Sequence, residues 1–230
     1  MAGAFKLDDV RPWGRNRAEY SAFFDIGGLE PSARILDCGG GPSSFNAEMT
    51  RLGYRVTSAD PLYGFEPAEI ADRVEATRAV MEAGLREARE RFVWTDYGSP
   101  ERVTEIRLAA MRHFLEDYEE GRSEGRYLDA ALPDLPLPDG SYDLVLCSHF
   151  LFLYTAQRDV AFHLACIREM ARIGREVRIF PLVDLEGEPS RHLEPLRREL
   201  AVLGYETAVR RVGYEFQKGG NEMLSVQAAK

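Results

Sequence analysis

The chain has 230 residues, of which 45% are hydrophobic and 29% are charged, and this composition excludes a disordered or fibrous protein. Its 29 basic and 38 acidic residues give a net charge of −9, which disfavours nucleic acid as a partner because phosphate backbones are bound by cationic surfaces. The three cysteines form no C-x-x-C pair, so we expect no disulfide framework and a cytoplasmic location. The first nine residues lack the features of a signal peptide, and no apolar run is long enough to cross a membrane.

The first predicted unit is a strand, a glycine turn and a helix. Residues 34–38 are an apolar run that stops at the three glycines 39–41, and a helix-compatible stretch follows over 43–52. Gly53 suits the left-handed cap that ends such a helix, and residues 54–60 read as a second strand. This order predicts a βαβ unit.

The stretch 64–124 departs from a plain alternation of strands and helices. It holds two candidate helices, at 67–91 and 100–120, where a single helix is expected between the second and third strands. Ser99 and the proline after it are a good start signal for the second helix. We therefore predict one domain over 1–230 with a helical insertion at 64–124.

The second half of the chain alternates buried strands with amphipathic helices and ends in two strands that form a hairpin. Runs that are apolar throughout belong to parallel sheets that are covered on both faces. The predicted elements lie at 141–148 (strand), 157–173 (helix), 176–182 (strand), 191–203 (helix), 205–212 (strand) and 221–227 (strand).

The glycine turn and the acidic residue after it indicate an adenosine-containing ligand. The turn exposes backbone N–H groups and a helix N-terminus to the polar end of a ligand. Asp60 ends the second strand 19 residues after Gly41, close to the spacing at which a carboxylate meets ribose hydroxyls. The structural alternative is a tight turn followed by an ordinary strand-end Asp. A dinucleotide fingerprint would need a third glycine where Ser44 stands.

The motifs resemble those of the class I S-adenosylmethionine-dependent methyltransferase family. Residues 35–41, with Asp37 before the glycines, are similar to its first motif, and 127–130 and 135–145 are similar to its third and fourth. One departure is Ser43, where a third glycine is common in the family. The resemblance implies an α/β fold, with a doubly wound, mostly parallel seven-stranded sheet that ends in an antiparallel hairpin.

The resemblance also implies a site for S-adenosylmethionine on the first two strands. Gly39 and Gly41 would let the methionine part of this cofactor approach the backbone, with Cys38 beside them in the same motif. Asp37 would orient the turn or bind the amino group of the cofactor. Asp60 would hold the ribose hydroxyls.

The third and fourth motifs would complete the site. Asp129 would accept a hydrogen bond from the adenine amino group, and Ala130 would offer its N–H to the ring. Cys147 and Ser148 would lie beside the sulfonium. His149 follows them at the expected ligand edge, where its ordinary pKa suits a general base. A hydrogen-bonded histidine in the wall of the site is an equal alternative.

Several other side chains have two readings each. His192 is either a second residue at the ligand edge or part of a loop. The aromatic residues either line the cofactor and acceptor sites or belong to the core; they are Trp13, Tyr20, Phe23, Phe24, Tyr63, Trp94, Phe152 and Tyr154. The sequence holds no spacing typical of metal ligands, so we predict no metal.

We therefore predict an S-adenosylmethionine-dependent methyltransferase that transfers its methyl group in line to a small-molecule acceptor. Residues 147–150 lack the Asp/Asn-Pro-Pro-aromatic motif of enzymes that methylate base or glutamine amino groups. One alternative is an NAD(P)-dependent oxidoreductase on a related βαβ core, and another is a non-catalytic module that binds S-adenosylmethionine. We expect no membrane partner, and a monomer or a homodimer.

Overall fold

The computed structural model describes residues 13–229, so the first nine residues, which bear on the signal-peptide prediction, lie outside the described residues. Within the described part of the chain, none of the helices has the length and apolar composition that a membrane crossing requires.

The centre of the molecule is one seven-stranded sheet in the order β3-β2-β1-β4-β5-β7-β6. Strands β3, β2, β1, β4 and β5 are parallel, whereas β7 is antiparallel to both β5 and β6. This arrangement confirms the doubly wound α/β fold with its C-terminal hairpin. The strands are β1 (Arg34–Cys38), β2 (Arg55–Ala59), β3 (Tyr127–Leu128), β4 (Tyr142–Ser148), β5 (Gly174–Phe180), β6 (Tyr205–Arg211) and β7 (Glu222–Ala228).

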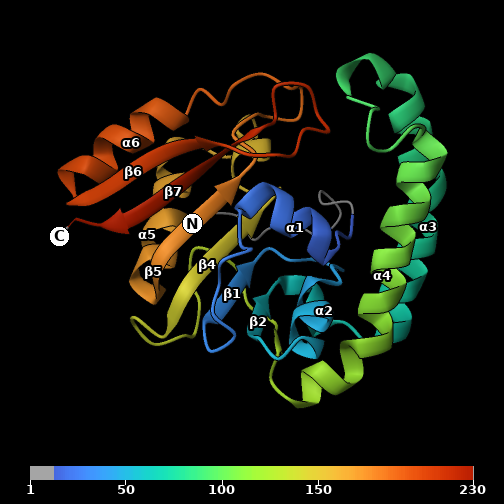
Figure 1. Cartoon of the computed structure of the whole chain (residues 1–230), viewed down its shortest axis with the longest axis horizontal. Helices are drawn as coiled ribbons and strands as arrows, with labels where there is room; N and C mark the ends of the chain where they lie inside the picture. Colours follow the sequence, from blue (N-terminus) through green and yellow to red (C-terminus); the bar gives the residue numbers. More distant parts are fainter. Residues whose placement is uncertain (1–12, 230) are drawn as a thin grey trace.

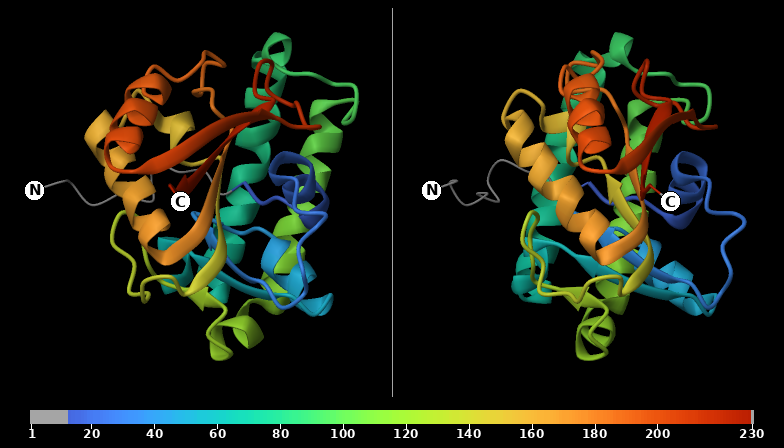
Figure 2. Two further views of the ribbon diagram at one scale, coloured as in Figure 1. Left: turned by 60° about the vertical axis from the view of Figure 1, so that its left-hand side comes forward. Right: turned by 90° about the vertical axis from the view of Figure 1, so that its left-hand side faces the viewer.

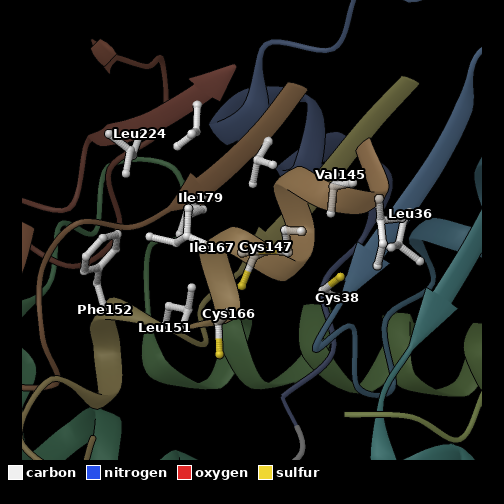
Figure 3. Close-up of a cluster of buried hydrophobic side chains, with 14 of the residues drawn as sticks. Leu36, Cys38, Val145, Cys147, Leu151, Phe152, Cys166, Ile167, Ile179 and Leu224 are labelled. Atoms are coloured by element: carbon white, nitrogen blue, oxygen red, sulfur yellow. The ribbon is translucent and has the colours of Figure 1, made fainter. Parts of the chain in front are cut away.

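Helices cover both faces of the sheet because successive strand side chains point to opposite faces. One face packs against α1 (Arg17–Phe24) and α2 (Phe45–Arg51), and its core is rich in phenylalanine. The other face packs against α5 (Val160–Ile173) and α6 (Leu193–Val202). Figure 3 shows this second core, in which side chains from β1, β4 and β5 meet those of α5.

The predicted insertion is a pair of long helices, α3 (Pro67–Glu87) and α4 (Pro100–Ser123). The two pack side by side at one end of the sheet, where α4 also contacts α2 (Figures 1 and 2). Ser99 caps α4 by accepting a hydrogen bond from the backbone N–H of Arg102 at 3.2 Å. Short 3-10 turns are η2 (Pro61–Gly64), η3 (Arg89–Arg91) and η4 (Phe152–Tyr154).

Most element boundaries differ from the sequence prediction by a few residues, and two of the differences have an evident local reason. The helix predicted at 157–173 starts at Val160, because the Asp159 carboxylate accepts the N–H of Phe162 at 2.8 Å and caps the helix there. The helix predicted at 67–91 ends at Glu87 and continues as η3. The strand predicted at 176–182 ends at Phe180, because Pro181 has no N–H to donate.

Candidate functional site

A cavity of about 730 Å³ opens at the carboxyl edge of the sheet. It reaches from the glycine turn after β1 to the ends of β4 and β5, and it is closed by α3, α4 and the loop between β6 and β7. Five of the predicted site residues line this cavity: Gly39, Gly41, Asp60, Ser148 and His149.

Backbone geometry explains why the turn after β1 is built from glycines. Gly39 and Gly41 have φ angles of 69° and 53°, in the left-handed region that side chains rarely adopt. A Cβ at Gly40 would collide with the carboxylate of Asp37, which lies directly beneath the turn. The Tyr63 hydroxyl donates to the Gly41 carbonyl at 2.8 Å. The loop is therefore held from below while its upper side faces the cavity.

Asp37 is buried under this turn and does not line the cavity. Its carboxylate accepts hydrogen bonds from the Tyr20 hydroxyl at 3.1 Å and from the Ser58 hydroxyl at 3.4 Å. Burial, with a smaller contribution from the charge of Asp60, raises the pKa of Asp37 to about 7, although the hydrogen bonds from Tyr20 and Ser58 act in the opposite direction. These contacts favour the first of its two predicted roles, which is to orient the turn.

Asp60 extends from the end of β2 to the edge of the cavity. Its two carboxylate oxygens accept the backbone N–H groups of Gly41 at 3.0 Å and of Leu62 at 2.8 Å. Burial raises the pKa of Asp60 to about 6, although these two N–H groups act in the opposite direction. Each oxygen keeps a further lone pair that can accept a ligand hydroxyl.

The two residues predicted to bind adenine lie beside the cavity and do not line it. Asp129 is exposed at the end of β3, with its carboxylate close to the Cα of Gly64 in η2. Ala130 is partly buried and packs against the core under α5. Asp60 lies near enough to Asp129 for the charge of Asp129 to raise its pKa.

The side chains of Cys38 and Cys147 belong to the core instead of the cavity. The two residues are register partners on β1 and β4, and both are fully buried, with Cys166 of α5 near them in Figure 3. Burial raises the pKa of both thiols. Only backbone atoms of these two cysteines remain for contact with a cofactor.

His149 lines the cavity with a strained backbone. Its φ of 52° is unusual for a residue with a side chain, and its N–H donates to the Phe180 carbonyl at 2.6 Å. The ring lies edge-on to Phe23 and Phe180, and its Nδ1 is 2.8 Å from the Ser148 hydroxyl. Burial lowers the pKa of His149 well below 6.5, and Arg15 and Arg107 lower it further, so the ring is neutral at pH 7.

The sequence patterns missed a charged cluster that faces His149. Arg107 of α4 is fully buried and forms an ion pair with Glu19 of α1, and the Tyr97 hydroxyl donates to Glu19 at 2.6 Å. Arg15 lines the same cavity just before α1. An arginine inside an amphipathic helix is typical of a solvated surface, so only the packing of α4 against α1 identifies Arg107.

The ambiguous aromatic and histidine residues divide between cavity and core. Trp13, Tyr20 and Tyr154 line the cavity, whereas the His192 ring is bonded to the carbonyls of Thr155 and Arg158 away from it. The side chains that pack in cores instead are those of Phe23, Phe24, Tyr63, Trp94 and Phe152. Within residues 13–229, no group of three or more His, Cys, Asp or Glu side chains is placed to hold a metal ion.

This donor and acceptor set fits S-adenosylmethionine. Acidic side chains follow β2 and β3, where ribose and adenine donors would meet them, and the bare glycine turn follows β1. At the β4 end, the cavity holds cationic and neutral nitrogen donors, which suit a carboxylate. The site thus combines the groups that a nucleoside with an amino-acid tail requires.

Two sequence comparisons identify relatives of this chain. A family model described as a methyltransferase domain matches residues 81–176. An uncharacterized protein of Methanocaldococcus jannaschii is 34% identical over 222 residues, which cover 96% of this chain and 97% of that protein. The chain belongs to the class I S-adenosylmethionine-dependent methyltransferase family. The oxidoreductase and the non-catalytic alternatives are therefore set aside.

The fold is also similar to that of solved methyltransferases. Magnesium protoporphyrin IX methyltransferase from Synechocystis, with bound S-adenosylhomocysteine, has a TM-score of 0.49 and 16% identity, covering 93% of this chain and 81% of that one. A methyltransferase from Methanosarcina mazei has a TM-score of 0.47 and 15% identity, covering 90% and 98%.

Proposed function

We propose that this methyltransferase acts on a small molecule that binds in the cavity between the glycine turn and His149. The cavity itself carries the proposal: its volume of about 730 Å³ is within the range of small-molecule sites, and aromatic side chains line it. The net charge of −9 is also unsuited to a nucleic-acid acceptor. The aromatic lining favours an acceptor with a flat, apolar part.

We further propose that different groups of the predicted residues bind different parts of the cofactor. Asp60 accepts from the ribose hydroxyls, while Asp129 and the N–H of Ala130 bind adenine. Backbone atoms at Cys38, Gly39 and Gly41 approach the methionine part, with Asp37 supporting the turn from below. Ser148 and the backbone atoms of Cys147 lie beside the sulfonium.

The chemistry assigned to the chain is alignment, exclusion of water and removal of a proton. S-adenosylmethionine supplies an electrophilic methyl group. The cavity walls hold the acceptor in line with it, which is the main requirement of such a displacement. The neutral ring of His149 accepts the proton that an acceptor hydroxyl or amine loses. Its hydrogen bond with Ser148 orients the ring during this step.

The test is an assay of a metabolite extract with methyl-labelled S-adenosylmethionine, followed by mass spectrometry of the labelled products. We expect label in a small molecule, and a His149→Ala variant with at least about a hundredfold lower kcat, the usual scale of general-base catalysis. His113→Ala, on α4 and outside the cavity lining, is the matched control. Label found only in the RNA or protein fraction would overturn the acceptor class, and full turnover by His149→Ala would remove the base.

A further inference from the structure

Three buried nitrogen donors without a partner gather at one place in the molecule. Among the described residues, the buried side-chain nitrogen and oxygen atoms that lack a hydrogen bond are Trp13 Nε1, Arg15 Nε and Arg107 Nε. All three residues line the cavity described above. Buried donors are nearly always paired, so three unpaired donors around one cavity point to a ligand that is rich in acceptor atoms.

The charge balance at this place is positive. The guanidinium of Arg107 is neutralised by Glu19, and it also donates to the Tyr214 hydroxyl at 3.4 Å. Arg15 has no carboxylate within ion-pair distance among residues 13–229, and its side chain donates only to the Trp13 carbonyl, at 3.1 Å. Two guanidinium groups therefore share a single carboxylate, and a buried excess charge is stable only when an anion balances it.

The electrostatics of the neighbours agree with this balance. Burial and the charge of Arg107 lower the pKa of Arg15 to about 10, so Arg15 remains a cation at neutral pH. The ring of His149 is neutral, because burial and the same two arginines oppose its protonation. His149 therefore adds no charge to this group, and Glu19 is the only carboxylate that pairs with either arginine among residues 13–229.

The backbone holds Arg15 firmly beside the glycine turn. The Arg15 carbonyl accepts from the Ser43 hydroxyl at 2.7 Å and from the Ser44 N–H at 3.0 Å. A Cβ on the preceding Gly14 would collide with the Pro42 carbonyl and with the side chain of Met111 in α4. The arginine is thus placed between the turn and α4 before any ligand binds.

We propose that Trp13, Arg15 and Arg107 form a carboxylate-binding subsite of the cavity. A carboxylate offers about four lone-pair positions in a plane, which suits three N–H donors and one uncompensated positive charge. Two molecules can supply it: the methyl donor, through its amino-acid carboxylate, or the acceptor. The acceptor source rests on the proposed function, whereas the donor source rests only on the family assignment.

Calorimetric titration at pH 7 tests the donor source. S-adenosylhomocysteine carries the carboxylate, and 5′-methylthioadenosine keeps the nucleoside but lacks the amino-acid part. We expect Arg15→Gln to weaken the binding of S-adenosylhomocysteine by about ten- to a hundredfold, which is the range of a charged hydrogen bond. The affinity for 5′-methylthioadenosine should stay unchanged. Unchanged binding of the second ligand also shows that the variant is folded. Arg73→Gln is the matched control, because Arg73 lines the same cavity but packs on the Phe65 ring.

The acceptor source is tested in the presence of saturating S-adenosylhomocysteine, with benzoate and its neutral analogue benzamide as probes. If the carboxylate comes from the acceptor, Arg15→Gln leaves the affinity for S-adenosylhomocysteine unchanged. The same variant then binds benzoate no more tightly than benzamide. If neither S-adenosylhomocysteine nor benzoate depends on Arg15, the subsite does not exist. If the wild-type protein binds neither nucleoside, the cofactor assignment is contradicted instead. The effect of Arg15→Gln on benzoate binding would then be the one measurement that tests the subsite.

Discussion

Asp60 already accepts two backbone N–H groups, so it has a structural task as well as its proposed ligand task. The hydrogen bond from Gly41 joins the ends of β1 and β2, and the bond from Leu62 starts η2. A carboxylate can perform both tasks because it has more lone pairs than these two donors use. The residue that follows β2 thus connects the turn geometry to the nucleoside.

We expect Asp60→Ala to weaken the binding of S-adenosylhomocysteine by about tenfold or more, because both the ribose contact and the support of the turn are lost. Calorimetry measures this change. Asp139→Ala is the control, since Asp139 is an exposed carboxylate outside the cavity lining. Unchanged affinity in a folded Asp60→Ala protein would contradict the ribose assignment.

The raised pKa of Asp37 should make the stability of the protein depend on pH. Because burial raises its pKa from 3.8 to about 7, the native protein keeps a proton that the unfolded chain releases between these values. Its contribution to stability is therefore full below about pH 4 and is lost as the pH rises to about 7. The slope from this one group is about 1 kcal/mol per pH unit.

Urea unfolding of the wild type and Asp37→Asn at several values between pH 4 and 7 measures this slope. The variant should show a flatter profile, although not a flat one, because the raised pKa of Asp60 acts in the same direction. Parallel profiles for the two proteins would show that Asp37 does not hold the proton.

At the scale of elements, the contact between α1 and α4 joins the insertion to the core. Glu19 and Arg107 come from these two helices, and their ion pair is buried with the hydroxyls of Tyr97 and Tyr214 around it. Burial favours the neutral acid, but the Arg107 charge reverses this effect and lowers the pKa of Glu19. The pair therefore depends on both partners being present.

We expect Glu19→Gln to lower the free energy of unfolding by about 3–5 kcal/mol, because Arg107 would keep a buried charge without its partner. Urea denaturation measures the loss. Glu101→Gln is a suitable control: its ion pair with Arg86 is exposed to solvent, so its removal should cost far less stability than the removal of the buried pair. A similar cost for both variants would mean that the buried pair has no special role.

At the scale of the whole molecule, the helical insertion is more acidic than the rest of the chain. Residues 64–124 contain 15 acidic side chains and 9 arginines, which is most of the net charge of −9. The insertion is nevertheless packed against the sheet region, because α4 contacts α2 and β3. These shared contacts support the prediction of a single domain over 1–230.

A single domain should unfold in one step. We expect urea transitions followed by tryptophan fluorescence, which reports Trp94 in the insertion and Trp13 packed against it, to coincide with those followed by circular dichroism of the whole chain. A fluorescence transition at lower urea than the circular dichroism transition would show that residues 64–124 unfold before the sheet. These residues would then form a unit of their own.

The sequence alone predicted the elements whose signals are local. Apolar runs located β1, β4 and β5, the glycines 39–41 located the turn, and Ser99 located the start of α4. The motif order also predicted the cofactor class, because the residues concerned follow strands that are regular enough to be recognised. Asp60 and His149 were singled out on this basis, and both reach the cavity.

Tertiary structure decided what depends on packing between distant segments. Arg107 became a buried member of the site only through the contact of α4 with α1, and the packing of α5 on the sheet placed the Cys147 side chain in the core. Arg15 and Arg107 line the same cavity although 92 positions separate them in the chain, so no local sequence pattern could predict that they are neighbours. Strand and turn signals act over a few residues, whereas the cavity is formed by contacts between elements far apart in the sequence.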